Sequence, residues 1–334
     1  MKKSYYLFNP GRLSRKDNTL CFVPVDEDGN EGQPRYIPIE GVDNLYCFGS
    51  LDANSAMYNF LGKNHVSVHF FDYYEHYTGS FMAKEYLLAG KMQVEQTRHY
   101  LSDKKRMVVA KTLVEGAAFN MSKNLKYYQG RGKDVAKQLG QIESYSPSIT
   151  DAGNIAELMG IEGNIRQAYY GAFGEIINDF DMGSRSKQPP QNEVNALISF
   201  GNMMCYTVCL DQIYHTQLNP TISFLHEPGA RRYSLALDLS EIFKPMLVDR
   251  TIFTVLNKKQ IQASDFRQDI NRCVLKEGAK KVFVQAFEER LKETFKHRLL
   301  GRSVSYKHLV KLECYKLQKH LLGMEVYKPF KMMW

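Results

Sequence analysis

The sequence lacks closely spaced cysteine pairs. No C-x-x-C motif occurs in the 334 residues, and such pairs are typical of redox-active thiols and zinc ligands. Positions 205 and 209 share one face of a predicted helix, which favours packing over metal ligation. We therefore expect reduced thiols in a cytoplasmic protein rather than a disulfide framework. The six cysteines are Cys21, Cys47, Cys205, Cys209, Cys273 and Cys314.

The sequence also lacks a segment that would cross or enter a membrane. Residues 196–214 are the longest apolar stretch, and they include Asn202 and Asp211, so a buried helix explains them. Residues 1–18 contain no apolar core of the kind that a secretory leader has. We expect neither secretion nor membrane insertion.

Several catalytic signatures are absent. Neither G-x-S-x-G nor H-E-x-x-H occurs, so the sequence does not predict a nucleophile-elbow hydrolase or a zinc peptidase. The stretch GRGKD at 130–134 lacks the glycine spacing of a phosphate-binding P-loop. In HVSVH, His65 and His69 fit a domain core or an interface better than a metal site.

Charge is distributed unevenly along the chain. Residues 1–90 hold eight Lys or Arg against eleven Asp or Glu, whereas the rest holds 36 against 25. A basic domain of this kind favours contact with a polyanion. A solvated basic surface without a partner explains the same numbers, so both interpretations stay open.

Two parts of the chain differ in sequence pattern. The first part contains short segments rich in β-branched and aromatic residues, such as TLCFVPV and HVSVHFFD, separated by polar turns. From about residue 89 apolar residues recur at helical spacing, and we expect helix also in SDFRQDINRCVL at 264–275. We predict an α+β fold, with a small N-terminal β domain over residues 1–88 followed by a larger all-α domain over residues 89–334.

A glutamate interrupts the apolar stripe of the helix predicted over residues 154–180. The stripe, spaced by three and four residues, consists of Leu158, position 162, Ile165, Tyr169, Phe173 and Ile176. A carboxylate facing a core is costly unless a cation, a metal ion or a hydrogen-bond donor meets it. Gly160 and Gly163 beside Glu162 suggest that backbone or a ligand approaches closely. The alternative is a surface ion pair between Glu162 and Arg166 at i,i+4, and it stays open.

A second polar group lies in ISFLHEPGARRYSLALDLSEIFKP, residues 222–245. His226 ends an apolar segment before a Glu-Pro-Gly turn, and Asp238 and Glu241 follow at i and i+3 on one helix face. The letters DLSE also resemble a capping box, with Asp238 as the N-cap of a helix. Both interpretations remain possible at this point.

Combined, Glu162, His226 and Glu241 make a set of two carboxylates and one imidazole, with Asp238 as an accessory acid. Oxygen-rich ligation with a single histidine suits Mg²⁺ or Mn²⁺ better than a structural zinc ion. The set predicts metal-dependent chemistry on a phosphodiester. Basic neighbours that a phosphate-handling site needs are Arg231, Arg232 and Lys244.

Three motifs in this order resemble the Cas-one family of CRISPR-associated proteins. They are LMGIEGNIRQAYY, NALISFG and FLHEPGARRYSLALDLSEIFKP, and the likeness spans most of the chain. The resemblance implies a metal-dependent DNA endonuclease and integrase that inserts short DNA fragments into a CRISPR array. It also implies that Glu162, His226 and Glu241 are catalytic and bind the divalent ion, with Asp238 as the neighbouring acid.

The same resemblance implies partners. It implies a homodimer, formed through the N-terminal domain, that joins the small Cas-two protein and captures double-stranded DNA. The DNA would be both the spacer precursor and the CRISPR repeat. Where many relatives have a tyrosine, this sequence has Asn202, so the role of that tyrosine is not transferred. Phosphate contacts are expected from Arg231, Arg232, Lys244, Arg185 and Lys187.

Two other functions remain open from the sequence. A general metal-dependent nuclease that acts on branched or single-stranded DNA would use the same residues. A non-catalytic DNA-binding scaffold would need none of them for chemistry, because Glu162 would simply be paired and DLSE would cap a helix.

Overall fold

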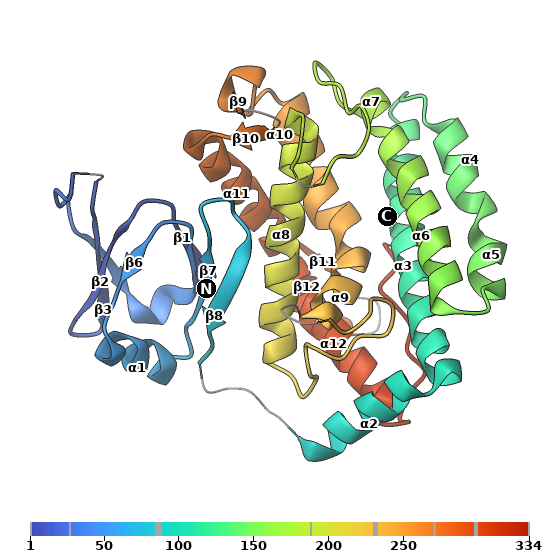
Figure 1. Cartoon of the computed structure of the whole chain (residues 1–334), viewed down its shortest axis with the longest axis horizontal. Coiled ribbons are helices and arrows are strands. Elements are labelled where there is room, and N and C mark those ends of the chain that lie inside the picture. The colour runs from blue at the N-terminus through green and yellow to red at the C-terminus, as the bar shows by residue number, and fades with distance from the viewer. Residues whose placement is uncertain are drawn as a thin grey trace. The chain divides into compact units, whose positions relative to one another are not determined.

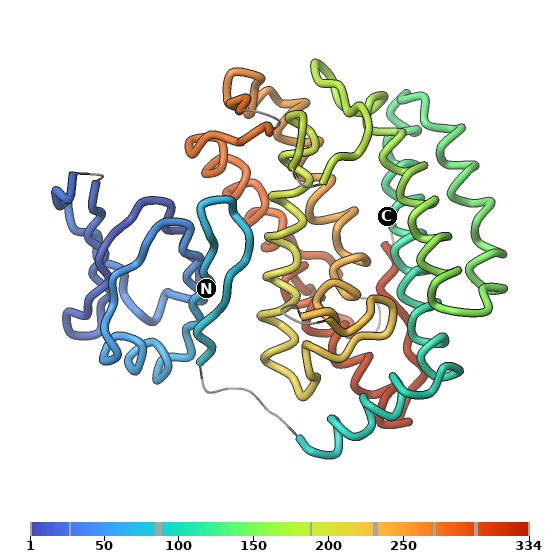
Figure 2. Tube along the Cα trace, viewed as in Figure 1, coloured from blue at the N-terminus to red at the C-terminus, as the bar shows by residue number. Residues whose placement is uncertain are grey.

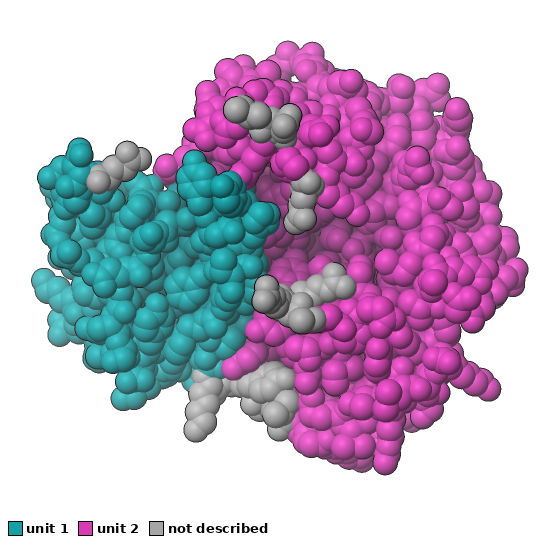
Figure 3. Space-filling view, viewed as in Figure 1, with its two compact units in different colours: residues 1–87 teal, residues 88–334 magenta. Residues whose placement is uncertain are grey.

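The chain divides into two compact units. The computed structural model describes residues 2–26, 28–83, 89–187, 189–229, 233–269, 272–296 and 300–332. Residues 1–87 form one unit and residues 88–334 the other, as coloured in Figure 3. The first contains mainly strands and the second mainly helices (Figure 1). The α+β class predicted from the sequence is confirmed.

Two four-stranded sheets and one helix form the first unit. One sheet has the order β1-β5-β7-β8, with only β8 antiparallel to its neighbour, and the other has the order β4-β3-β2-β6. Helix α1 (Ser55–Lys63) begins after Asn54, whose side chain accepts the N–H of Met57. The strands are β1 (Lys3–Leu7), β2 (Gly11–Lys16), β3 (Thr19–Pro24), β4 (Arg35–Pro38), β5 (Val42–Cys47), β6 (Leu51–Asp52), β7 (Ser67–Phe71) and β8 (Tyr77–Phe81).

His69 belongs to the core of this unit. Its side chain is fully buried, its ring lies 4.9 Å from the ring of Tyr46, and its Nδ1 lies 2.7 Å from the hydroxyl of Ser80. The sequence pattern favoured a core role for this histidine over a metal site, and the observed packing agrees.

Helices form most of the second unit. Its longest helices are α3, α8 and α6, and α8 is buried along most of its length. Among the described residues, no helix is both long and apolar enough to cross a membrane. The helices are α2 (Gly90–Leu101), α3 (Asp103–Gln129), α4 (Ala136–Ser144), α5 (Ser146–Asp151), α6 (Ile155–Gly171), α7 (Phe173–Ile176), α8 (Glu193–Tyr214), α9 (Ser234–Lys244), α10 (Arg250–Asn257), α11 (Glu277–Lys292) and α12 (Tyr306–Leu321).

Two short hairpins also occur in the helical unit. Strands β9 (Phe266–Asp269) and β10 (Arg272–Leu275) pair, as do β11 (Thr294–Lys296) and β12 (Ser303–Ser305). The helix predicted over 264–275 is therefore wrong. In β10 burial alternates, with Cys273 and Leu275 inside, and this period of two is that of a strand.

A π-helical turn, η2 (Pro245–Asp249), follows α9 directly. Proline has no N–H, so the regular hydrogen-bond ladder cannot continue through position 245. Two asparagines of α3 satisfy carbonyls at this break: Asn120 Nδ2 donates to the Ile242 oxygen at 3.0 Å, and Asn124 Nδ2 to the Pro245 oxygen at 3.1 Å. Helix α3 thereby fixes the end of α9, and π-turns of this kind often mark functional sites.

The C-terminal segment packs along α3 (Figure 2). The N–H of Met332 donates to Asn120 Oδ1 at 2.9 Å, and Asn120 Nδ2 donates to the Phe330 oxygen at 3.1 Å. A Cβ at position 116 would lie 2.6 Å from the Pro329 Cβ, so Gly116 is required for this close approach. Asn120 thus contacts both the C-terminal segment and α9.

Candidate metal centre

Helix α6 carries Glu162 on its buried face. Leu158, Ile165 and Tyr169 on the same stripe are fully buried, as the spacing predicts. The Glu162 side chain is 14% exposed, so it lies at the edge of the core rather than on the open surface. Within the described part of the chain, nothing lies within 4 Å of a Cβ built on Gly160 or Gly163. The glycines therefore do not reflect close backbone packing, and they leave open space beside Glu162.

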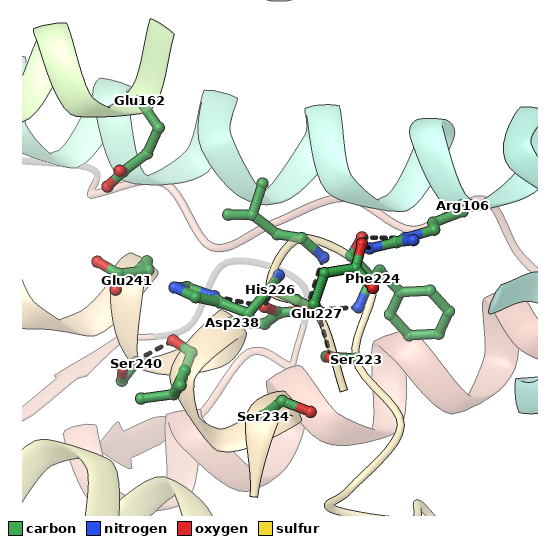
Figure 4. Close-up of polar contacts among 12 residues, drawn as sticks. Arg106, Glu162, Ser223, Phe224, His226, Glu227, Ser234, Asp238, Ser240 and Glu241 are labelled. Atoms are coloured by element: carbon green, nitrogen blue, oxygen red, sulfur yellow. Dashed lines mark hydrogen bonds and ion pairs between the residues drawn. The ribbon is translucent and has the colours of Figure 1, made fainter. Parts of the chain in front are cut away.

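Asp238 holds the segment that carries His226. One Asp238 oxygen accepts the N–H groups of Phe224 at 2.7 Å and Leu225 at 3.0 Å. The other accepts the N–H of His226 at 2.9 Å and lies 2.8 Å from its Nδ1. The carboxylate is fully buried, so these donors replace its lost hydration. Figure 4 shows Asp238 beneath this segment.

This arrangement overturns the capping-box interpretation of DLSE. Helix α9 begins at Ser234, so Asp238 lies in its second turn and is not the N-cap. Its hydrogen bond fixes the proton of His226 on Nδ1 and leaves Nε2 as the acceptor nitrogen. Burial lowers the pKa of His226, but the hydrogen bond and charge of Asp238 outweigh it and raise the pKa overall. Asp238 is thus a positioning residue for the imidazole.

Arg106 and Tyr100 hold the same segment from the other side. Arg106 Nε donates to the Phe224 oxygen at 2.8 Å, and one of its terminal nitrogens pairs with Glu227 at 2.6 Å. The Tyr100 hydroxyl donates to Glu227 at 3.0 Å. The sequence analysis missed Arg106, although it lies on a buried stripe of α3 with Val109. A charge on a buried stripe is the same signal that identified Glu162.

Glu241 is paired with two basic side chains. One of its oxygens accepts from Lys244 Nζ at 2.6 Å, and the other contacts Nη2 of Arg166. Arg166 Nε also donates to Glu162 Oε1 at 2.7 Å, so its guanidinium joins the two acids. Burial raises the pKa of Glu241, but Arg166 and Lys244 outweigh this effect and hold it at about 2. The pair of Glu162 and Arg166 is therefore real, but it is a largely buried bridge rather than a surface pair.

Arg166 joins two of the three predicted ligands, and Asp238 holds the third. Figure 4 draws Glu162 on α6, His226 in the loop before α9 and Glu241 on α9. Among the residues that the structure describes, no group of three or more His, Cys, Asp or Glu side chains is placed so that it could hold a metal ion. Two carboxylates and an imidazole with a fixed tautomer are a donor set that fits Mg²⁺ or Mn²⁺. The three side chains are thus ligands of the kind that these ions prefer. Arg166 bridges the two acids among them.

The predicted basic residues differ in their surroundings. Lys244 is 9% exposed and pairs with Glu241. Arg185 binds Asn195 Oδ1 at 2.9 Å and the Ser199 hydroxyl at 3.3 Å, so it also orders the loop before α8. Lys187 is exposed. Arg231 and Arg232 lie outside the described residues.

Asp249, in the π-helical turn, is a further buried acid that the sequence analysis missed. Burial raises its pKa to about 7, although Arg166 and the Tyr169 hydroxyl act in the opposite direction. Its Oδ1 has no hydrogen-bond partner among the described residues. An acid with such a buried oxygen keeps its proton more readily than it would in water.

This raised pKa predicts a pH-dependent stability of the metal-free protein. Between the ordinary Asp pKa of 3.8 and about 7, the unfolded chain loses the proton while the folded chain keeps it. Folding stability therefore falls as pH rises through this window. From pH about 5 to about 7.5, we expect the wild type to lose about 2 kcal/mol relative to Asp249→Asn.

Urea unfolding in the presence of a chelator measures this difference. Contributions from His226 occur in both proteins and cancel in the subtraction. Asp151→Asn, at an exposed acid, is the matched control and should follow the wild type. Equal pH slopes for the wild type and Asp249→Asn would show that Asp249 titrates normally.

The fold and the ionisable side chains together define a class: an α+β protein whose helical unit contains two largely buried acids joined by an arginine and a histidine held by a third acid. The profile of one family, "CRISPR associated protein Cas1", matches residues 5–289. The chain is 47% identical to the CRISPR-associated endonuclease Cas1 of Fusobacterium nucleatum, over 100% of this chain and 98% of that protein. This chain belongs to the Cas1 family of CRISPR-associated endonucleases, as its motifs predicted.

Solved structures support the same assignment. The Cas1 protein TM1797 of Thermotoga maritima matches with a TM-score of 0.85 and 38% identity, over 98% of this chain and 99% of that one. A casposase bound to integration product shares the fold, with a TM-score of 0.86 and 20% identity over 99% and 93% of the chains. A chain of a Cas6-RT-Cas1–Cas2 complex also shares it, with a TM-score of 0.81 and 17% identity over 100% and 36%.

Proposed function

We propose that this protein inserts short DNA fragments into a CRISPR array, using Mg²⁺ or Mn²⁺ held by Glu162, His226 and Glu241. The observation that carries the proposal is that Arg166 joins Glu162 of α6 to Glu241 of α9, while Asp238 of α9 holds His226 (Figure 4). The reaction is a transesterification, in which the 3′-hydroxyl of the incoming DNA attacks a phosphodiester of the repeat. A new P–O bond forms, and the bond to the displaced 3′-oxygen breaks.

The ion, when bound, would supply Lewis-acid stabilisation of the charge that develops on the phosphoryl oxygens. The side chains of this protein prepare that position. Glu241 is ionised at neutral pH because its pKa is about 2, and the proton of His226 is held on Nδ1 by Asp238. His226 Nε2 is thereby left to bind, and the Arg106 contacts keep its loop in place.

DNA binding belongs to the same proposal. Lys187 is exposed and suited to phosphate contact, whereas Arg185 and Lys244 also have structural partners. Arg231 and Arg232, which follow His226 closely in the chain, complete the proposed set. The net charge of +8 and the concentration of basic residues after position 90 support an electrostatic grip on a duplex.

Partners and location are proposed by likeness. The structure of a Cas6-RT-Cas1–Cas2 complex contains a chain of this fold, which supports assembly with a small Cas2 protein. We assign dimerisation to residues 1–88 and catalysis, metal binding and DNA binding to residues 89–334. Six free, buried cysteines are consistent with a reducing, cytoplasmic location.

A strand-transfer assay tests the function. A labelled DNA duplex is mixed with a plasmid that carries a CRISPR repeat, the protein and its Cas2 partner. We expect labelled plasmid with Mn²⁺ or Mg²⁺, and none after chelation, because Glu162 and Glu241 lack the ion that joins them to the phosphate.

A duplex with 3′-dideoxy ends is the matched control. It binds the protein equally but has no nucleophile, so the label should not be joined. Plasmid cleavage that is equal with both duplexes would instead identify a general nuclease. Binding without cleavage or joining, unaffected by metal, would identify a scaffold.

A further inference from the structure

Arg166 binds one oxygen of each of the two acids that are proposed to hold the metal ion. Its guanidinium binds Glu162 Oε1 through Nε at 2.7 Å and contacts Glu241 Oε2 through Nη2. The second Glu241 oxygen is bound by Lys244 at 2.6 Å. The side chains of Arg166, Glu162 and Glu241 are 13%, 14% and 8% exposed, so the cluster is shielded from water. These carboxylates are therefore already neutralised in the metal-free protein.

A positive charge is required at this position whether or not metal is present. Two carboxylates brought together near a core repel each other and lose hydration unless a cation lies between them. Arginine suits this purpose because it stays charged at any physiological pH and its planar fork binds two acceptors at once. A guanidinium and a divalent ion beside the same two acids repel each other and compete for the same carboxylate oxygens.

We propose that Arg166 is the resident cation of the metal-free site and that a divalent ion binds by exchange with its guanidinium. The inference rests on the proposed metal site of Glu162, His226 and Glu241. Arg166 then holds the two acids in position and lowers the affinity of the site for a metal ion. A weakly bound monovalent ion does not displace a doubly bonded guanidinium, whereas a divalent ion held by three ligands does.

Asp249 offers the displaced guanidinium a second partner. Arg166 and Tyr169 both lie on α6, and the Tyr169 hydroxyl and the charge of Arg166 both act on the buried Asp249 carboxyl. Asp249 Oδ1 has no hydrogen-bond partner among the described residues, so it is able to accept a new donor. In the proposed exchange, Asp249 is the acceptor that the displaced guanidinium binds.

Calorimetric titration of the chelator-treated protein with Mn²⁺ tests the exchange. Arg166→Met removes the competing cation at similar length, and we expect Mn²⁺ to bind about tenfold more tightly than to the wild type. Arg98→Met is the matched control, because Arg98 lies on α2 and pairs with Glu95 in an exposed i,i+3 bridge. It should leave Mn²⁺ affinity unchanged.

A double-mutant cycle tests the role of Asp249. Asp249→Asn should weaken Mn²⁺ binding when Arg166 is present, because the displaced guanidinium then lacks an acceptor. In the Arg166→Met background the same change should have little effect. An equal effect of Asp249→Asn in both backgrounds would overturn the exchange between these partners.

Thermal unfolding gives an independent readout. Without metal, Arg166→Met should unfold at a lower temperature than the wild type, and saturating Mn²⁺ should remove most of this difference. If Arg166→Met does not fold, Arg166→Lys is the second variant. Lysine keeps the positive charge but lacks the planar guanidinium that binds two acceptors at once, so the Mn²⁺ affinity of this variant should be higher than that of the wild type.

The outcomes separate this inference from the proposed function. Equal or weaker Mn²⁺ binding by the Arg166 variants overturns the exchange and leaves the metal site intact. If neither the wild type nor the Arg166 variants bind Mn²⁺, the metal site itself is wrong, and both proposals fall.

Discussion

Glu162→Gln is expected to reduce strand transfer about 1000-fold while the protein stays folded. The amide is a neutral and weaker ligand than the carboxylate, so the divalent ion would lose one of its two acidic donors. Loss of a few kcal/mol of charge stabilisation in the transition state accounts for a factor of this size. Initial rates of plasmid joining at saturating Mn²⁺ measure the effect.

Two comparisons make this result interpretable. Glu175→Gln makes the same chemical change at an exposed position on α7 and should retain the wild-type rate. DNA affinity of Glu162→Gln should change little, because phosphate contacts rather than Glu162 dominate binding. Strand transfer within a factor of about ten of the wild type would reject Glu162 as a metal ligand.

Asp238→Ala is expected to destabilise the fold by about 3–5 kcal/mol. The substitution leaves three buried N–H groups and the His226 ring without their acceptor, in a position that water does not reach. Because whole domains are stable by only about 5–15 kcal/mol, this is a large share of the total. Urea unfolding of the metal-free protein gives the difference directly.

Asp238→Asn separates structure from chemistry. The amide oxygen still accepts backbone N–H groups, but the NH₂ group faces His226 Nδ1 and favours the tautomer with the proton on Nε2. That tautomer cannot bind a metal ion through Nε2, so strand transfer should fall at least about 10- to 100-fold with a smaller loss of stability. Ser240→Ala on the same helix removes one hydroxyl bond to the Leu237 oxygen and should cost only about 1 kcal/mol. An unfolding curve for Asp238→Ala that matches that of Ser240→Ala would contradict the positioning role.

The sequence was sufficient to predict the candidate ligands but not all of their partners. Glu162 stood out because a helical period of 3.6 places it on a stripe whose other members are fully buried. The relation of Asp238 to His226 was not predictable, since it depends on where α9 begins, and helix boundaries are the weakest part of pattern reasoning. With the start at Ser234, the acid faces the loop instead of its own helix end.

Contacts between segments that are distant in the sequence could not be predicted either. A pair between Arg166 and Glu162, four residues away, was one of the interpretations left open by the sequence, but the second partner of Arg166, Glu241, lies 75 positions later. Local spacing contains no information about which helix packs against which. The hairpin at 266–275 was missed for a related reason, because short segments with few apolar residues fit both a helical and an extended period.

The Asn120 side chain joins two segments that are made at different times during protein synthesis. Its nitrogen binds the carbonyl of Ile242, next to Glu241, and also that of Phe330, while its oxygen accepts from Met332. Because ribosomes make residue 332 long after residue 241, the residues of α9 are synthesised well before the C-terminal segment that also binds Asn120. Helix α9 therefore gains this link to the C-terminal segment only after the residues around Met332 have been made.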